Sequence, residues 1–416
     1  MMSRIIFHID VNSAFLSWDA VDRLQHGETI DLRNIPSIVG GDPKKRSGIV
    51  LAKSIPAKKF GIKTAQTLVD AFKLCPQLVC VSPRYNVYTK ASKAMMALLR
   101  EYSPDVEIFS IDECFLDYTT VEKLFGSPLE AAYVMQKRIE DELGFTVNIG
   151  ISTNKILAKM ASDLEKPNKV HTLYPHEVQE KLWPLHVSDL FMVGRSTEAK
   201  LIKYGIDTVG DLAQTDLNFL KYILKSHGEL IYNFAWGRDV SIVNDEKYSL
   251  VKSIGNSTTI PYDITEREDA ARYILSLCES VGMRLRAAEM RAYVIAIHIK
   301  TNGFDTIQKQ HKMLYTISST NDIYEEAMRL FDVLWNQVPI RHLGVRVSQL
   351  QEELPRQLYL LKQEDEKIET LDQTIDDLRE RFGKEIISRA SLIQTKVKSM
   401  SGGVGDDDYP GMRSLI

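Results

Sequence analysis

The chain has 416 residues, of which 44% are hydrophobic and 26% charged, with 52 Lys and Arg against 56 Asp and Glu. This length predicts two to four domains, and the apolar content is too high for a chain that is mainly disordered. The net charge of −4 argues at first against a nucleic-acid partner, because such proteins usually present a basic surface.

The cysteines and the N-terminus predict a cytoplasmic protein. No C-x-x-C pair is present, and Cys75 and Cys80 lack histidines at zinc-finger spacing, so free thiols in a reducing compartment are expected. The N-terminal apolar stretch reaches Asp10 too soon for a signal peptide. No window approaches the roughly 18 apolar residues that a membrane-spanning helix needs.

The first part of the chain alternates predicted strands and helices. Residues 4–11 alternate as a short strand that ends in a carboxylate, residues 106–118 as two strand arms around an acidic middle, and residues 146–152 as a third strand. Helical periodicity covers residues 88–102 and 129–143. This order predicts an α+β sheet covered by helices.

The pattern of predicted secondary structure changes in the later part of the chain. Short helices punctuated by glycine follow residue 175, and a polar connection covers residues 239–252. Residues 253–349 return to alternating strands and helices, residues 364–393 form a charged amphipathic helical tract, and residues 401–416 are predicted to be disordered. A helical region and a separate α/β domain are therefore expected.

The strongest candidate site joins Asp10, at a strand end, with Asp112 and Glu113 between the two strand arms. Converging carboxylates can hold two Mg²⁺ ions, which prefer hard oxygen ligands and substrate phosphates. Adjacent residues of a regular strand point to opposite faces, so Asp112 and Glu113 can serve one site only if the chain bends or bulges there, and we predict that it does. Solvated surface carboxylates are the alternative, but all three lie in apolar strand contexts, where an unpaired charge is costly.

Four short segments form an ordered set of motifs. They are Ile9-Asp10-Val11-Asn12-Ser13-Ala14-Phe15, Ser110-Ile111-Asp112-Glu113, Gly150-Ile151-Ser152-Thr153-Asn154-Lys155 and Lys166-Pro167-Asn168. Over about residues 3–350 the chain resembles the Y-family lesion-bypass DNA polymerases, of the DNA polymerase IV type. The resemblance implies an α+β right-hand polymerase with a ferredoxin-like palm, small fingers, a helical helix–hairpin–helix thumb and an α/β little-finger domain. The implied ranges are palm 1–21 and 80–173, fingers 22–79, thumb 174–238, linker 239–252, little finger 253–349 and tail 350–416.

The resemblance also implies where the chemistry would take place. Asp10, Asp112 and Glu113 would be the catalytic residues and, with the Val11 carbonyl, would hold two Mg²⁺ ions per active site. The reaction would be in-line nucleotidyl transfer from a dNTP to a primer 3′ end, with low fidelity and past damaged template bases.

Substrate contacts follow from the same motifs. The implied substrate-binding residues are Asn12, Ser13, Ala14, Phe15, Lys58 and Lys166. Phe15 falls at the steric-gate position, where an aromatic ring would clash with a ribose 2′-hydroxyl; a core residue of an amphipathic helix is the alternative. The fingers motif departs from the family pattern, because Ile55 replaces a common tyrosine and Lys58 the usual arginine. The triphosphate would therefore be held more weakly, or with help from Lys53 or Ser54.

Three further segments imply DNA and clamp contacts. Gly194 and Arg195 lie in a helix–hairpin–helix pattern, where backbone N–H groups approach a DNA phosphate; a simple turn is the alternative. Arg341 and Arg346 lie on a predicted little-finger strand, either along template phosphates or as ordinary edge-strand arginines. The implied clamp-binding residues are Gln357, Leu358, Leu360 and Leu361, which would enter a groove of the sliding clamp. A monomer that binds primer–template DNA is expected.

Two other functions stay open from the sequence. A palm-type nucleotidyl cyclase would make its product from a nucleoside triphosphate alone, and Gly40-Gly41-Asp42 resembles a cyclase signature without its following acidic residue. A non-catalytic DNA-binding or clamp-binding accessory protein would have no use for the three carboxylates.

The distribution of charge changes the first inference from the net charge. Residues 351–416 carry 10 basic and 14 acidic side chains, which accounts for the whole excess of negative charge. Residues 33–100 carry 13 basic and 2 acidic side chains, around the implied fingers and triphosphate approach. A local basic segment therefore removes the objection to a nucleic-acid partner.

Overall fold

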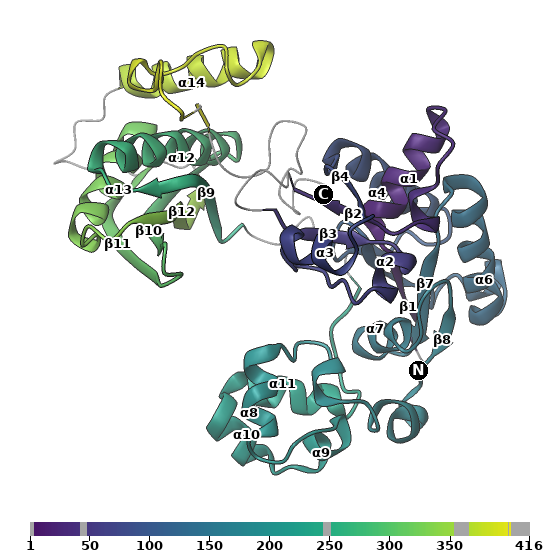
Figure 1. Ribbon diagram of the computed structural model, residues 1–416. Helices are drawn as coiled ribbons and strands as arrows, with labels where there is room; N and C mark the ends of the chain where they lie inside the picture. Colours follow the sequence, from purple (N-terminus) through teal and green to yellow (C-terminus); the bar gives the residue numbers. More distant parts are fainter. Residues whose placement is uncertain (1–3, 42–47, 244–250, 353–365, 398, 401–416) are drawn as a thin grey trace. The chain divides into compact units, whose positions relative to one another are not determined.

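The computed structural model describes residues 4–41, 48–243, 251–352, 366–397 and 399–400 (Figure 1). They divide into two compact units, the first with described residues 4–41 and 49–243 and the second with residue 48 and those from 251 onward. The predicted clamp-binding peptide and the predicted disordered stretch 401–416 lie outside the described residues. Among the helices of the described ranges, none is long and apolar enough to cross a membrane.

The first unit is built on a five-stranded sheet in the order β5-β6-β1-β7-β8. The strands are β1 (Ile6–Val11), β5 (Val106–Ile108), β6 (Glu113–Asp117), β7 (Val147–Ser152) and β8 (Val170–Thr172). Neighbouring strands are antiparallel except β7 and β8, which are parallel. The predicted strand regions 4–11, 106–118 and 146–152 are confirmed, with β1 and its neighbours at the centre of the sheet.

The two faces of this sheet carry different side chains. Phe7 and Ile9 of β1 belong to the main core, which they share with residues of α1 (Ala14–Gln25), α4 (Tyr85–Arg100) and α6 (Pro128–Arg138). The other face carries the polar side chains of β1 and is covered by α7 (Lys155–Asp163). Helix α7 comes very close because β7 has Gly150 there: a Cβ atom at this position would lie 2.0 Å from the Ala158 carbonyl oxygen.

The predicted fingers and thumb complete the first unit. The fingers contain a three-stranded sheet in the order β3-β2-β4, with β2 (Ser37–Gly40), β3 (Val50–Lys53) and β4 (Val79–Val81), and the helices α2 (Ile55–Lys59) and α3 (Leu68–Leu74). The thumb contains α8 (Arg195–Ile202), α9 (Val209–Gln214), α10 (Leu217–Leu224) and α11 (Ser226–Ala235), around a hydrophobic core that also includes residues of α7. Shorter helices are η1 (Leu32–Asn34), α5 (Glu122–Phe125), η2 (Ile139–Leu143), η3 (Pro175–Glu177), η4 (Val178–Leu182) and η5 (Val187–Asp189). Strand β4 crosses the implied boundary between fingers and palm.

The second unit contains a four-stranded antiparallel sheet in the order β11-β10-β12-β9. Its strands are β9 (Ser253–Ile264), β10 (Met290–Thr301), β11 (Thr306–Ile317) and β12 (Ile340–Glu352). Helices α12 (Arg267–Ala287) and α13 (Thr320–Leu334) pack with the sheet around one hydrophobic core. The predicted alternation of strands and helices in residues 253–349 is confirmed.

The charged tract is helical over a shorter range than predicted. Helix α14 spans Glu366–Phe382, and only the short turn η6 (Ala390–Leu392) follows. Gly383 ends the helix with φ 93°, a left-handed conformation that favours glycine. The tract packs against the rest of the second unit. Arg286 of α12 donates to Asp376 of α14 at 2.6 Å, and Arg379 of α14 donates to the buried Glu279 at 2.8 Å.

Candidate active site

Strand pairing brings the first two carboxylates together. Asp10 lies opposite Glu113 of β6 on one side and opposite Asn148 of β7 on the other. Directly opposed residues of antiparallel strands point to the same face of the sheet. Asp10 and Glu113 therefore share the face that α7 covers.

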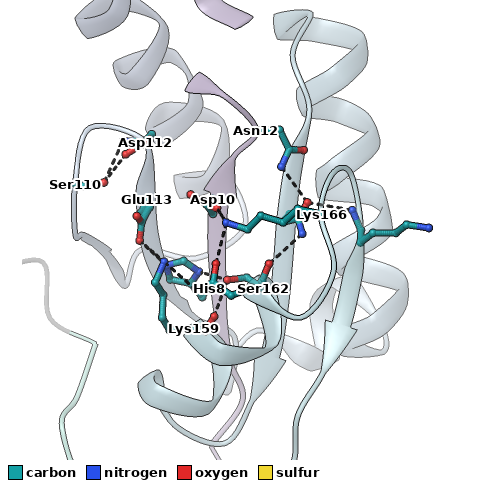
Figure 2. Close-up of polar contacts among 12 residues, drawn as sticks. His8, Asp10, Asn12, Ser110, Asp112, Glu113, Lys159, Ser162 and Lys166 are labelled. Carbon is teal, nitrogen blue, oxygen red and sulfur yellow. Dashed lines mark hydrogen bonds and ion pairs between the residues drawn. The ribbon is translucent and has the colours of Figure 1, made fainter. Parts of the chain in front are cut away.

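A bend between β5 and β6 adds the third carboxylate, and the predicted bend is confirmed. Residues 110–112 leave the strand conformation, and the N–H groups of Phe109 and Ser110 both donate to the Glu113 carbonyl at 3.0 Å. The Val11 N–H donates to the Asp112 carbonyl at 3.0 Å, which fastens the bend to the end of β1. Figure 2 shows the bend bringing Asp112 to the same end of the sheet as Glu113 and the β1 carboxylate.

Glu113 is held by residues that the sequence analysis did not identify. Lys159 of α7 donates to Glu113 Oε2 at 2.7 Å, and His8 Nε2 lies 3.1 Å from the same oxygen (Figure 2). His8 Nδ1 lies 2.7 Å from the Ser162 hydroxyl. Burial alone would raise the pKa of Glu113, but the hydrogen bond with His8 and the charge of Lys159 lower it to about 2. A lysine one helical turn after Lys155, on a helix facing an acidic strand, is the signal that could have found Lys159.

Asp10 is buried and paired with a lysine. Lys166 donates to Asp10 Oδ2 and also to Asp163 Oδ1, the latter at 2.8 Å. Burial alone would lower the pKa of Lys166, but the charge of Asp10 and the hydrogen bond with it raise the pKa. Lys166 therefore stays an ammonium group beside Asp10.

Asp112 lacks such a partner. Its Oδ1 accepts from the Ser110 hydroxyl at 2.6 Å, and no cation pairs with it in the part of the chain that the structure describes. Burial raises the pKa of Asp112, the Ser110 hydrogen bond opposes this, and the negative charges of Asp10 and Glu113 raise it further. Asp112 thus lacks a neutralising positive charge among the described residues, and its carboxylate oxygens, together with those of Asp10, are of the type that binds a divalent cation.

The described side chains do not form a preassembled metal cluster. No group of three or more His, Cys, Asp or Glu residues in the described ranges has the arrangement of a metal site. Lys166 and Lys159 instead lie against Asp10 and Glu113 and neutralise them.

A cavity of about 350 Å³ opens beside Asp10 and Asp112. Its lining includes every implied substrate-binding residue, namely Asn12, Ser13, Ala14, Phe15, Lys58 and Lys166, as well as Val11. Glu113 does not line it, because its side chain turns to Lys159 and His8. The cavity thus combines carboxylates at one end with lysines from the fingers.

Phe15 lies at the cavity and is also packed. Its ring stacks on Tyr88 of α4, with ring centroids 4.6 Å apart and an angle of 9° between planes. Tyr85 meets it edge-on at 5.8 Å. The two sequence interpretations of Phe15 are therefore compatible, since a packed ring is a rigid cavity wall.

The fingers offer a second lysine to the cavity. Ser54 accepts from the Ala57 N–H at 3.0 Å as the N-cap of α2, and its hydroxyl donates to a backbone carbonyl, so it is already engaged. Lys53 lines the cavity and donates to the Thr64 hydroxyl at 3.1 Å. Burial and the nearby charge of Lys58 lower the pKa of Lys53, as expected for neighbouring cations with no anion between them.

The implied DNA-binding residues lie on two separate surfaces. Gly194 is the exposed N-cap of α8, followed by the exposed Arg195. Arg346 is exposed on β12 and lines a hollow of about 380 Å³ with His298 and His342. Arg341, near a register shift in β12, lies over the Phe304 ring at 5.0 Å.

Comparisons with known proteins agree with this geometry. Residues 9–163 match the impB/mucB/samB family, residues 175–206 the IMS family HHH motif, and residues 251–360 the impB/mucB/samB family C-terminal domain. The match over residues 175–206 confirms the predicted helix–hairpin–helix.

Relatives and a solved structure cover nearly the whole chain. DNA polymerase IV of Clostridium acetobutylicum is 45% identical over 401 residues, covering 95% of this chain and 100% of the relative. DNA polymerase IV 1 of Bacillus subtilis is 35% identical over 410 residues, covering 98% of this chain and 97% of the relative. A Y-family DNA polymerase chimera superimposes with a TM-score of 0.72 at 24% identity, over 84% of this chain and 99% of the chimera, which bears out the predicted fold.

Proposed function

Because the chain belongs to the impB/mucB/samB family of Y-family DNA polymerases and is a DNA-directed DNA polymerase, we propose that it extends primers past damaged template bases, with low fidelity and with Mg²⁺ as cofactor. The observation that carries the proposal is the single cavity lined by Asp10, Asp112, Phe15 and lysines from two domains. Asp10 and Asp112 are a carboxylate pair that can hold metal ions, Phe15 is a wall against the sugar, and the lysines are cations that can bind a triphosphate.

Asp10, Asp112, Glu113 and the Val11 carbonyl would hold two Mg²⁺ ions, which when bound stabilise the entering 3′ oxygen and the leaving pyrophosphate. Glu113 is kept ionised and oriented by Lys159. Ser110 orients Asp112 in the bend. We assign no side chain as the general base.

The triphosphate would lie among cations. Lys166 both neutralises Asp10 and lines the cavity, so its ammonium is placed to contact a triphosphate once Asp10 gains another cation. Lys53 and Lys58 approach from the fingers. Residues 13–15, at the N-terminus of α1, would add backbone N–H groups and the positive end of a helix dipole.

DNA would be bound through phosphates on two surfaces. The exposed Gly194 and Arg195 offer the start of α8, and Arg346 with Arg341 offers positive charge on the little-finger sheet. A monomer and a cytoplasmic location remain predictions.

We also propose that the segment with Gln357, Leu358, Leu360 and Leu361 binds the sliding clamp. In the sequence this segment lies between β12 and α14. Replacing Gln357 and Leu358 by alanine is expected to lower the length of product made per binding event with clamp present. Without clamp the variant should match the wild type, and a loss in both conditions would contradict the assignment.

Primer extension with Mg²⁺ and dNTPs tests the proposed activity. Asp112→Asn and Glu113→Gln are each expected to lower the extension rate roughly a thousandfold, because each removes a charge that metal binding needs. Glu107→Gln is the matched control, since Glu107 is also a strand glutamate paired with a lysine of α7, Lys155, but is not among the proposed metal ligands.

Each alternative function gives a different result in that assay. Equal activity of the wild type, Asp112→Asn and Glu113→Gln would remove the proposed site. Absence of extension by the wild type would favour an accessory protein. Product formed from nucleoside triphosphate without primer–template would favour a cyclase.

A further inference from the structure

Lys166 lies on an irregular segment, residues 164–169, between the end of α7 and the start of β8. A lysine side chain is long and flexible, so a useful position in a binding site depends on how its backbone is held. Two amide side chains, Asn12 and Asn148, hold the backbone on both sides of Lys166.

Asn148 is fully buried on β7 and uses its whole hydrogen-bonding capacity. Its Nδ2 donates to the Ser162 carbonyl at 3.0 Å and to the Glu165 carbonyl at 2.6 Å. Its Oδ1 accepts from the Lys169 N–H at 3.3 Å and from Asn12 Nδ2 at 3.0 Å. One side chain thus joins the end of α7 to the irregular segment on both sides of Lys166.

Asn12 continues the connection on the cavity side. Its Oδ1 accepts from the Asn168 N–H at 2.9 Å and from the Thr146 hydroxyl at 3.0 Å. The four backbone groups bound by the two amides belong to residues 162, 165, 168 and 169, so they lie on both sides of Lys166 in the sequence.

We propose that Asn12 and Asn148 form an amide clip that sets the position of Lys166 and thereby the affinity for the dNTP triphosphate. The inference rests on the proposed contact between Lys166 and the triphosphate. In this view Asn148 is a positioning residue, which acts through Lys166 and does not itself touch the substrate.

Removal of the clip should weaken nucleotide binding and leave the chemical step nearly unchanged. Asn148→Ala leaves the Ser162 and Glu165 carbonyls without their donor, so the segment relaxes and the Lys166 ammonium occupies more positions. The expected loss of dNTP affinity is about tenfold, the size of one charge-assisted contact. The bend with Asp112 has no hydrogen bond to either amide among the contacts of the described residues, so the rate with bound nucleotide should change by less than about threefold.

The experiment measures the dissociation constant of the correct dNTP from the full chain bound to a primer–template whose primer ends in a dideoxynucleotide. Wild type, Asn148→Ala, Lys166→Met and the double variant form a cycle. Asn148→Ala is expected to raise the constant about tenfold in the wild-type background but less than about twofold in the Lys166→Met background. A purely structural role of Asn148 would give the same fold-change in both.

Asn154→Ala is the matched control. Asn154 is also a buried amide with two backbone partners, the Leu157 N–H at 2.9 Å and the Gly237 carbonyl at 2.8 Å, but it lies at the other end of α7. Its replacement should lower the unfolding temperature without changing the dNTP dissociation constant. If Asn148→Ala does not fold, Asn12→Ala takes its place in the cycle, since Asn12 is only half-buried, with an expected rise of about threefold.

The outcomes separate the clip from the proposed function. A rise caused by Lys166→Met, with none from Asn148→Ala or Asn12→Ala, would overturn the clip and leave the role of Lys166 intact. Equal effects of the asparagine variants in both backgrounds would also overturn it. An unchanged constant for Lys166→Met would remove the triphosphate contact itself, and the clip with it.

Discussion

The palm sheet and the little-finger sheet present their functional side chains in opposite ways. On the palm, Asp10 and Glu113 each pair with a lysine, and Asp112 is oriented by Ser110. On the little finger, Arg346 is exposed beside an open hollow. Nucleotidyl transfer requires reacting atoms in fixed places, whereas phosphate binding along a duplex depends mainly on charge. The palm sheet therefore holds its charged side chains in fixed positions, and the little-finger sheet keeps Arg346 accessible.

Replacing one glycine in each sheet by alanine should give the largest difference between the palm and the little finger. A Cβ atom on Gly150 of the palm would lie 2.0 Å from the Ala158 carbonyl oxygen and 2.4 Å from the Ser162 nitrogen. For a Cβ atom on Gly255 of the little finger, the three nearest atoms would be two of the Arg346 side chain and one backbone carbonyl oxygen, all at 3.1 Å or more. Gly150→Ala is expected to destabilise the first unit by about 3 kcal/mol, and Gly255→Ala the second by less than about 1 kcal/mol.

Calorimetry of both variants, with primer extension alongside, checks this expectation. Gly150→Ala should also lose activity, because α7 carries Lys159 and leads into the Lys166 segment. Equal stability of the two variants would mean that α7 does not lie as close to the sheet as we describe.

The contrast also explains what the sequence could predict. The acidic strand ends and the bend at Asp112 follow from local patterns of apolar and charged residues. The partners of Glu113 do not. His8 meets Glu113 only once β1 pairs with β6. Lys159 meets it only when α7 packs onto β7, and that approach depends on the single glycine at position 150. Asn148 was missed for the same reason, since its four partners come from three elements.

Other differences have local causes. The strands β2, β3 and β4 of the fingers have only three or four residues each, too short for a clear alternating pattern. The helix predicted over residues 364–393 ends earlier, at Phe382, because Gly383 adopts a left-handed conformation that stops it. Burial of its charged residues depends on Arg286 and Glu279, which are distant in sequence.

A second prediction concerns the rigid wall of the palm cavity. Phe15→Ala should increase ribonucleotide incorporation relative to dNTP by roughly 10- to 100-fold, because a 2′-hydroxyl then meets no ring, while dNTP extension stays largely intact. Competing incorporation of the two nucleotides measures the ratio. Tyr88→Phe is the matched control, since it keeps the ring that stacks on Phe15. Unchanged sugar discrimination in Phe15→Ala would remove the steric-gate assignment.

The smallest effect is expected for a substitution on the little finger. The dependence of DNA affinity on salt and on template sequence then distinguishes a contribution of charge from a specific contact. Arg346→Ala should weaken primer–template binding about threefold at moderate salt, equally for templates of different sequence, and should lower the slope of log affinity against log salt by about 1. Arg267→Ala is the control, because Arg267 lies on α12 and pairs with Asp332. A loss that depends on template sequence, or that persists unchanged at high salt, would mean that Arg346 contributes a specific contact. The little finger would then rely on fixed geometry as the palm does, and the comparison between the two sheets would no longer hold.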